Sequence, residues 1–186
     1  MRLLLLSALL LVACRDATVP EPLPSFEELS GSTDTLGIAS ARGRTVDSLS
    51  LAQVSELLTR PDKPTVLLFW RADESRSLAT LTTLTQASNM PSQQGYRYIA
   101  VQVDPSVHRA QVDALVRTSG VWYEAYQLSD TTTAWSYTLQ TGWDGSTPTT
   151  AVTRPGMEPL FYTDRVFGDT LEVAAVLSFL ESPTTR

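Results

Sequence analysis

The chain has 186 residues, of which 42% are hydrophobic and 18% are charged, so it can bury the core of one ordinary domain. Its net charge of −6 excludes a nucleic-acid binder of the usual kind, because neutralising phosphates requires a basic face. One cysteine, Cys14, and one histidine, His108, are present. These counts exclude an intramolecular disulfide and a metal site built on several cysteines or histidines, and we expect no metal and no cofactor.

An apolar run opens the chain and stops at the cysteine. Residues 3–13 are apolar apart from one serine and would span about 16 Å as a helix, half of the roughly 30 Å hydrocarbon core of a membrane. A secretory signal peptide over residues 1–13 therefore fits better than a membrane-spanning helix. The ending Leu-Val-Ala-Cys14 resembles the bacterial lipoprotein signal, which implies cleavage after residue 13 and lipidation of Cys14. The alternative is an ordinary signal peptide that happens to carry a cysteine.

Residues 14–44 are predicted to comprise the lipidated cysteine and a flexible tether. Three prolines and three glycines interrupt this stretch, and no apolar period is sustained. A coil of about 30 residues has a mean end-to-end distance of roughly 30 Å, enough to hold a domain away from a bilayer. We expect an exported protein that the lipid on Cys14 anchors to a bacterial membrane, on the periplasmic or cell-surface side. Inner and outer membranes both fit.

Strands and helices alternate over residues 45–186, which we expect to form one domain. Ser50 and Gln53 match a capping box that opens a helix, and residues 65–70 form an apolar run with the length of a buried strand. The other predicted elements are a helix over 75–88, a strand over 96–104, a helix from a cap at Ser106 to 118, a strand over 121–128, a short helix from a cap at Asp130 to 139, a hairpin of 149–154 with 160–166, and a helix from 169 whose core face includes Leu171, Ala174, Ala175, Leu177 and Leu180. This order predicts an α/β sandwich with a mixed sheet.

Four segments, taken with this order, resemble the thioredoxin superfamily, in particular its TlpA-like envelope branch. They are 63–70 (Lys-Pro-Thr-Val-Leu-Leu-Phe-Trp), 98–104 (Tyr-Ile-Ala-Val-Gln-Val-Asp), 146–150 (Ser-Thr-Pro-Thr-Thr) and the closing hairpin with its helix. The strand and short helix between residues 121 and 139 match the insertion of that branch. The resemblance implies a three-layer sandwich, with a central mixed sheet flanked by helices, and a cis peptide bond before Pro148.

The resemblance also locates a redox motif that this chain lacks. In active members a Cys-x-x-Cys pair opens the helix that follows the Phe-Trp strand end, and its thiolate is the nucleophile. The matching positions here are held by Glu74, Ser75, Arg76 and Ser77. Neither a carboxylate nor a serine hydroxyl can form a mixed disulfide, so the resemblance predicts a redox-inactive site.

The resemblance also implies a partner-binding groove, which does not depend on the missing cysteines. In the family, the residue before the cis proline binds an extended partner segment through its backbone, a form of strand addition. That residue is Thr147 here, and Pro148 follows it. Trp143 precedes them in a glycine-flanked loop and is either a core side chain or a recognition residue of the groove.

The sequence does not favour another catalytic reaction at residues 74–77. A nucleophilic Ser77 would need a base, and the sole histidine, His108, is more simply a surface residue. Asp73 and Glu74 suit a helix start, where the dipole favours negative charge. We therefore expect a lipid-anchored, redox-inactive domain, not an enzyme, that binds or assembles with an envelope protein. The alternatives are a docking component of a thiol–disulfide exchange pathway whose thiols a partner supplies, and a purely structural spacer.

Overall fold

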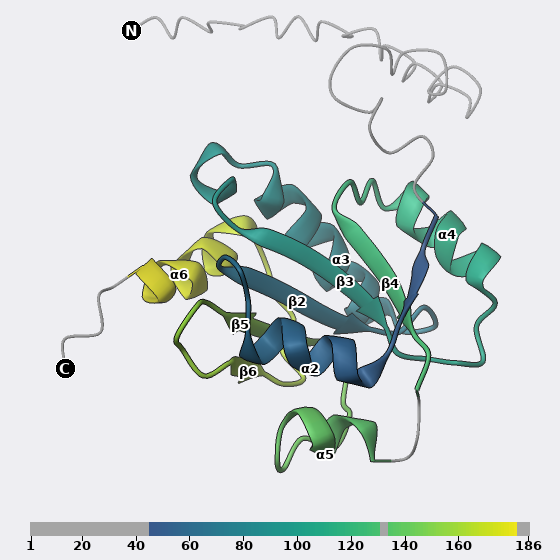
Figure 1. Ribbon diagram of the computed structural model, residues 1–186. Helices are drawn as coiled ribbons and strands as arrows, with labels where there is room; N and C mark the ends of the chain where they lie inside the picture. Colours follow the sequence, from purple (N-terminus) through teal and green to yellow (C-terminus); the bar gives the residue numbers. More distant parts are fainter. Residues whose placement is uncertain (1–44, 131–133, 182–186) are drawn as a thin grey trace, which may run out of the picture. The chain divides into compact units, whose positions relative to one another are not determined.

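The structure is a computed structural model that describes residues 45–130 and 134–181 (Figure 1). The predicted signal peptide, Cys14 and the tether to residue 44 lie outside these residues. The elements in chain order are β1 (Asp47–Leu49), α2 (Leu51–Thr59), β2 (Thr65–Trp70), α3 (Ser75–Ser88), the short 3-10 helix η2 (Pro91–Gln93), β3 (Arg97–Gln102), α4 (Arg109–Thr118), β4 (Glu124–Leu128), α5 (Trp135–Leu139), β5 (Thr149–Thr153), β6 (Leu160–Tyr162) and α6 (Thr170–Glu181).

Six strands form one mixed sheet in the order β1-β4-β3-β2-β5-β6. The first four strands of this order are parallel to one another, whereas β5 is antiparallel to both β2 and β6. Every residue of β2 is buried, which explains why its sequence is continuously apolar instead of alternating. The predicted mixed sheet is thus confirmed.

Helices cover both faces of the sheet (Figure 1). On one face Val66, Leu68 and Trp70 of β2 join side chains of α3, α4 and α6 in one core cluster. On the other face Leu67 and Phe69 join side chains of α2 in a second cluster. Because successive side chains of a strand point to opposite faces, β2 supplies both cores of a three-layer sandwich.

Helix starts follow the prediction in α2 but not in α4 or α5. The capping box of α2 is confirmed: the Ser50 hydroxyl accepts a hydrogen bond from the Gln53 amide, and the Ser50 amide donates to Gln53 Oε1. α4 begins two residues later than predicted, with His108 as its N-cap, because the Ser106 hydroxyl donates to Asp104 instead of capping the helix. α5 begins at residue 135. The Asp130 carboxylate accepts from the first amide of α2, where free N–H donors are available.

The predicted core face of α6 is wrong in part. Leu171 is 71% exposed and Ala175 is also exposed. Leu177 is buried as predicted, and Val173 and Val176, which the prediction left out, are buried as well. The predicted Leu180 lies outside the side chains that the structure describes. The helix is apolar around much of its circumference, so its sequence contains no clear polar face to orient it. The prediction also omitted β1, a three-residue edge strand with little apolar pattern.

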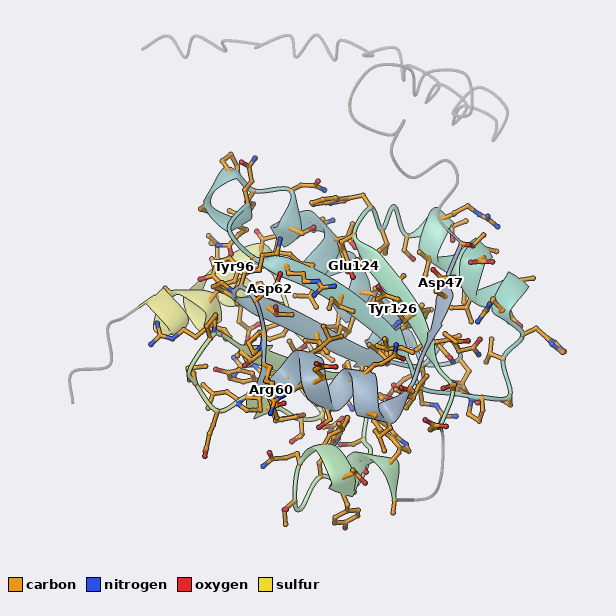
Figure 2. All side chains as sticks on the ribbon, viewed as in Figure 1. Asp47, Arg60, Asp62, Tyr96, Glu124 and Tyr126 are labelled. Carbon is orange, nitrogen blue, oxygen red and sulfur yellow. The ribbon has the colours of Figure 1, made fainter. Side chains whose placement is uncertain are left out.

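An ion pair joins β3 to β4 at the beginning of both strands. The Arg97 guanidinium donates to both oxygens of Glu124 at 2.7 Å, and the Tyr126 hydroxyl donates to the same carboxylate at 2.8 Å. Glu124 and Tyr126 are labelled in Figure 2. The hydrogen bond from Arg97 lowers the pKa of Glu124. Among the residues that the structure describes, no helix is long and apolar enough to cross a membrane.

Candidate functional site

The start of α3 carries Glu74 and Ser77, at the positions where the resemblance implies a Cys-x-x-Cys pair in active members. Three residues separate the end of β2 from Glu74, the N-cap of α3, and Ser77 lies in the first turn. The Ser77 side chain is fully buried. Its hydroxyl donates to Glu74 Oε2 at 2.6 Å and accepts from the Arg71 amide at 3.2 Å. Ser77 therefore holds the loop after β2 against the first turn of the helix.

The same carboxylate oxygen reaches the loop before β5. The Thr147 hydroxyl donates to Glu74 Oε2 at 2.6 Å, across 73 residues of sequence. The peptide bond between Thr147 and Pro148 is cis, as the resemblance implied. The structure thus brings Glu74, Ser77 and Thr147 together around one oxygen atom, and their short hydrogen bonds to a carboxylate are of the stronger kind.

A cleft of about 540 Å³ lies at this contact. Its lining residues come from the loop after β2, the loop before β5 and the end of β6: Arg71, Asp73, Glu74, Gly145, Ser146, Thr147 and Asp164. Of the residues that the sequence proposed for the site, Glu74 and Thr147 line the cleft. Ser77 and Pro148 are buried.

Both arginines beside Glu74 are bound by other carboxylates. Arg71 donates to both oxygens of Asp73, at 3.2 and 3.3 Å, and to Asp104 Oδ2 at 3.1 Å. Arg76 donates to Asp164 Oδ1 at 2.7 Å and to its carbonyl oxygen at 2.9 Å. Hydrogen bonding to Asp73 raises the pKa of Arg71. Both arginines are therefore already paired with carboxylates of this chain.

Asp104 is expected to make a pH-dependent contribution to stability. Its side chain is 10% exposed, and hydrogen bonding from Ser106 lowers its pKa the most, with Arg71 acting in the same direction. Its pKa in the folded chain thus lies below the unfolded value of about 3.9. The stabilisation is present above about pH 4 and is lost as the pH falls through the folded pKa.

The variant Asp104→Asn should accordingly lower the free energy of unfolding by about 1.5–3 kcal/mol at pH 7, the usual contribution of a hydrogen bond to a charged group. Urea unfolding at pH 7 and pH 3 checks this expectation. The difference between natural chain and variant should shrink at pH 3, because this pH lies below the unfolded pKa of about 3.9 and the unfolded chain then binds a proton that the folded Asp104 resists. A difference that stays constant with pH would contradict the electrostatic account.

Trp143 is a core residue and not a recognition residue of the groove. It is 2% exposed, and its ring lies 4.9–5.7 Å, centroid to centroid, from those of Trp135, Phe69 and Phe161. Its indole nitrogen donates to the Ser146 carbonyl at 3.1 Å. The structure thus decides the alternative that the sequence left open, and the expectation of Trp143 at the binding surface is corrected. Trp143 supports the cleft loop from beneath.

Sequence reasoning missed the charged partners at the edge of the cleft. Asp164 follows the three-residue strand β6 and has a positive φ of 52°. Asp104 follows β3, and only the parallel pairing of β2 with β3 brings it near Arg71. Parallel strands end at the same edge of a sheet. Asp104 and Arg71, which follow β3 and β2, could therefore have been predicted to lie close together. No comparable pattern pointed to Asp164.

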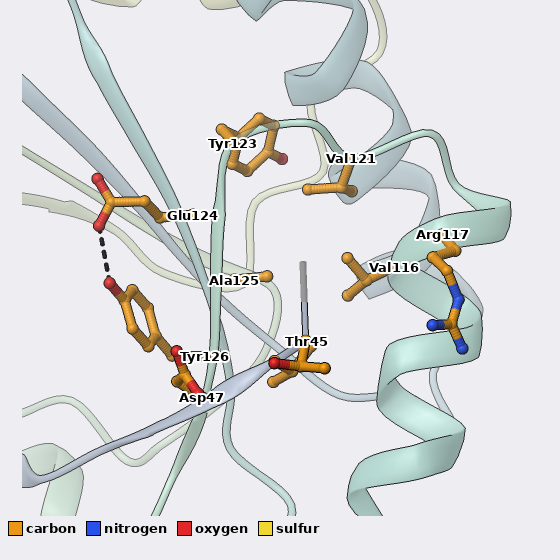
Figure 3. Close-up of a pocket in the computed structure, with 10 residues that line it drawn as sticks. Thr45, Asp47, Val116, Arg117, Val121, Tyr123, Glu124, Ala125 and Tyr126 are labelled. Carbon is orange, nitrogen blue, oxygen red and sulfur yellow. Dashed lines mark hydrogen bonds between the residues drawn. The ribbon is translucent and has the colours of Figure 1, made fainter. Parts of the chain in front are cut away.

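The geometry gives no support to Ser77 as a nucleophile that His108 activates. His108 is the N-cap of α4, while the Ser77 hydroxyl is bonded to Glu74 and Arg71. Within residues 45–130 and 134–181, no three His, Cys, Asp or Glu side chains are grouped to hold a metal ion. A separate hollow of about 230 Å³ lies between β1, α4 and β4 (Figure 3) and contains none of the predicted site residues.

The cis proline lies beside the start of α3, a helix that covers the sheet, as the resemblance to the thioredoxin fold implied. No protein-family model matches the chain, and no curated protein matches it in sequence. Solved structures do match it. A secreted Mycobacterium tuberculosis disulfide oxidoreductase, homologous to E. coli DsbE, aligns with a TM-score of 0.51 and 11% identity over 75% of this chain and 97% of that chain.

Two further structures agree. A DsbF homologue from Corynebacterium diphtheriae aligns with a TM-score of 0.53 and 18% identity over 66% of this chain and 75% of its own. A thiol:disulfide interchange protein of the thioredoxin family from Chlorobium tepidum has a TM-score of 0.50 and 9% identity, over 73% of this chain and 96% of its own. Likeness at such identities establishes the fold. The predicted thioredoxin-like fold class is confirmed.

Proposed function

We propose that this chain is a thioredoxin-like domain without thiol–disulfide chemistry of its own, which binds a segment of another protein in the cleft beside Glu74 and Thr147. The observation that carries the proposal is the carboxylate of Glu74, whose Oε2 accepts hydrogen bonds from Ser77 and Thr147 at 2.6 Å each. These hydrogen bonds among Glu74, Ser77 and Thr147 occupy the start of α3, where active proteins of this fold hold a pair of thiols.

The replacement keeps the binding geometry while removing the reaction. Thiol–disulfide exchange requires attack by a thiolate on a disulfide sulfur, and the sequence has one cysteine, far from residues 74–77 along the chain. The Glu74 carboxylate instead links α3 to the loop before β5. The cleft between them therefore keeps its two sides in a fixed relation, which is a property that a binding site needs.

We place this domain outside the cytoplasm, attached to a bacterial membrane by lipid on Cys14. The support is the sequence Leu-Val-Ala-Cys14 at the end of a short apolar run, together with structural neighbours that include a protein described as secreted. Multiple acyl chains give stable anchoring where a single chain does not. The proposed partner is then another protein of the cell envelope.

Site-specific photo-cross-linking tests the proposal in intact envelopes with the full chain. A photoreactive side chain is placed at Ser146, which lines the cleft, and in a matched variant at Glu158, which is exposed in the turn between β5 and β6. We expect a discrete cross-linked protein from position 146 and none from position 158. Equal labelling at both positions, or none at either, would contradict a binding cleft.

A second function is favoured by the neighbours' own names, which describe disulfide oxidoreductases. In that version the domain docks a protein of an exchange pathway, and the partner supplies both thiols. The identity of the cross-linked protein separates the two versions. A partner with a Cys-x-x-Cys pair supports docking in an exchange pathway, whereas a partner without thiols supports a general binding or assembly role.

A further inference from the structure

Two polar side chains at the carboxyl ends of β2 and β3 are buried without a hydrogen-bond partner among the residues that the structure describes. They are the indole of Trp70 and the amide of Gln102, and both side chains are 0% exposed. The unpartnered atoms are Trp70 Nε1 and both polar atoms of the amide, Nε2 and Oε1. Folded proteins rarely leave such groups unpaired, because each one loses its bonds to water on burial.

The two side chains are neighbours on the face of the sheet that α3, α4 and α6 cover. Trp70 and Gln102 are partners in the parallel register of β2 and β3, and the backbones of paired strands lie about 4.8 Å apart. Trp70 and Ala100 belong to the core cluster of this face. Side chains alternate along a strand, so Gln102 lies on the same face as Ala100. The buried and unpartnered hydroxyl of Thr150 lies there too, because Thr150 pairs with Leu68 of the same cluster.

We infer that a buried water molecule binds between Trp70 and Gln102. The indole N–H is a donor only, whereas the amide offers donors and an acceptor whichever way it is turned. A water molecule can both accept and donate, so it can accept from the indole and at the same time bond the amide. Buried waters make about two to four hydrogen bonds to polar groups that the protein otherwise leaves unpaired. Trp70 and Gln102 together supply such a set of groups at one place in the core.

This water joins the two strand ends that carry an ion pair of the cleft. Arg71 directly follows Trp70 in the chain, and Asp104 lies two residues after Gln102. The Arg71 guanidinium donates to Asp104 Oδ2 at 3.1 Å. The two strand ends are therefore linked twice, by the ion pair beside the cleft and by the water in the core. Trp70 is also the last residue of β2 before the loop that leads to Glu74.

Water–protein NMR on the full chain purified in detergent tests the inference, with the variant Trp70→Phe to assign the indole signal. We expect a cross-peak between water and the Trp70 indole proton that changes sign between the NOESY and ROESY spectra, which distinguishes a held water from proton exchange. The matched control is Trp143, a buried indole whose N–H donates to the Ser146 carbonyl and which should show no such cross-peak. A Trp70 indole without the cross-peak, as in a direct bond to the Gln102 amide, would overturn the inference.

Two variants identify the groups that hold the water. Gln102→Leu removes the amide and should abolish the cross-peak, because the indole alone offers fewer bonds than a buried water needs. Thr150→Val removes a hydroxyl whose own exchanging proton could relay the signal, and this variant should keep the cross-peak. A cross-peak that survives in Gln102→Leu, or that disappears in Thr150→Val, would overturn a water held between Trp70 and Gln102. The natural chain and Thr150→Val decide the question even if Gln102→Leu does not fold.

Discussion

Replacing Trp143 with alanine should lower the free energy of unfolding by about 3–5 kcal/mol, the usual effect of truncating a large buried aromatic side chain. The indole is 2% exposed and contacts the rings of Phe69 and Trp135. Its N–H also donates to the Ser146 carbonyl at 3.1 Å. The substitution therefore leaves a cavity and removes one of the two hydrogen bonds that the Ser146 carbonyl accepts, the other coming from the Thr149 hydroxyl at 2.7 Å.

Urea unfolding followed by circular dichroism measures this effect. The matched control is Tyr137→Ala, an aromatic residue of α5 that is 55% exposed and whose truncation should change stability by less than about 1 kcal/mol. Equal losses in the two variants would show that Trp143 is not the buried anchor described above.

The double variant Glu74→Cys and Ser77→Cys should gain a thiol–disulfide activity that the natural chain lacks. The first cysteine would occupy the N-cap of α3 and the second its first turn. A helix N-terminus lowers the pKa of a thiol, which favours the nucleophilic thiolate. We expect the oxidised variant to be two hydrogen atoms lighter than the reduced one by mass spectrometry, and to catalyse insulin reduction by dithiothreitol.

The single variant Glu74→Cys is the control, because without the second thiol it cannot complete the intramolecular step that releases a substrate. A double variant that keeps its fold yet forms no disulfide between positions 74 and 77 would mean that these residues do not correspond to the dithiol of the fold.

The elements with one clear pattern were predictable from the sequence. β2 has an uninterrupted apolar run that only a fully buried strand requires, and α3 was predicted over the residues where it lies. The approach of Glu74 to Thr147 followed from the resemblance, since the fold places its helix start beside the cis proline.

The sequence alone could not predict whether a residue is buried or exposed where its local pattern fits both, nor which distant segments meet. Trp143 lies in a loop, where the alternation and helical periods that reveal burial do not operate. Leu171 belongs to a helix without a distinct polar face, so several rotations about its axis bury similar apolar area. Asp164 reaches the cleft only through the antiparallel pairing of β6 with β5, a long-range relation that local spacing does not encode.

A domain that holds Glu74 and Ser77 in place of a dithiol should show no redox turnover. The decisive measurement is insulin reduction by dithiothreitol in the presence of the purified natural chain, with the double cysteine variant as the positive control. We predict that the natural chain gives the same rate as dithiothreitol alone at every protein concentration. A rate that rises in proportion to the concentration of the natural chain would contradict the account.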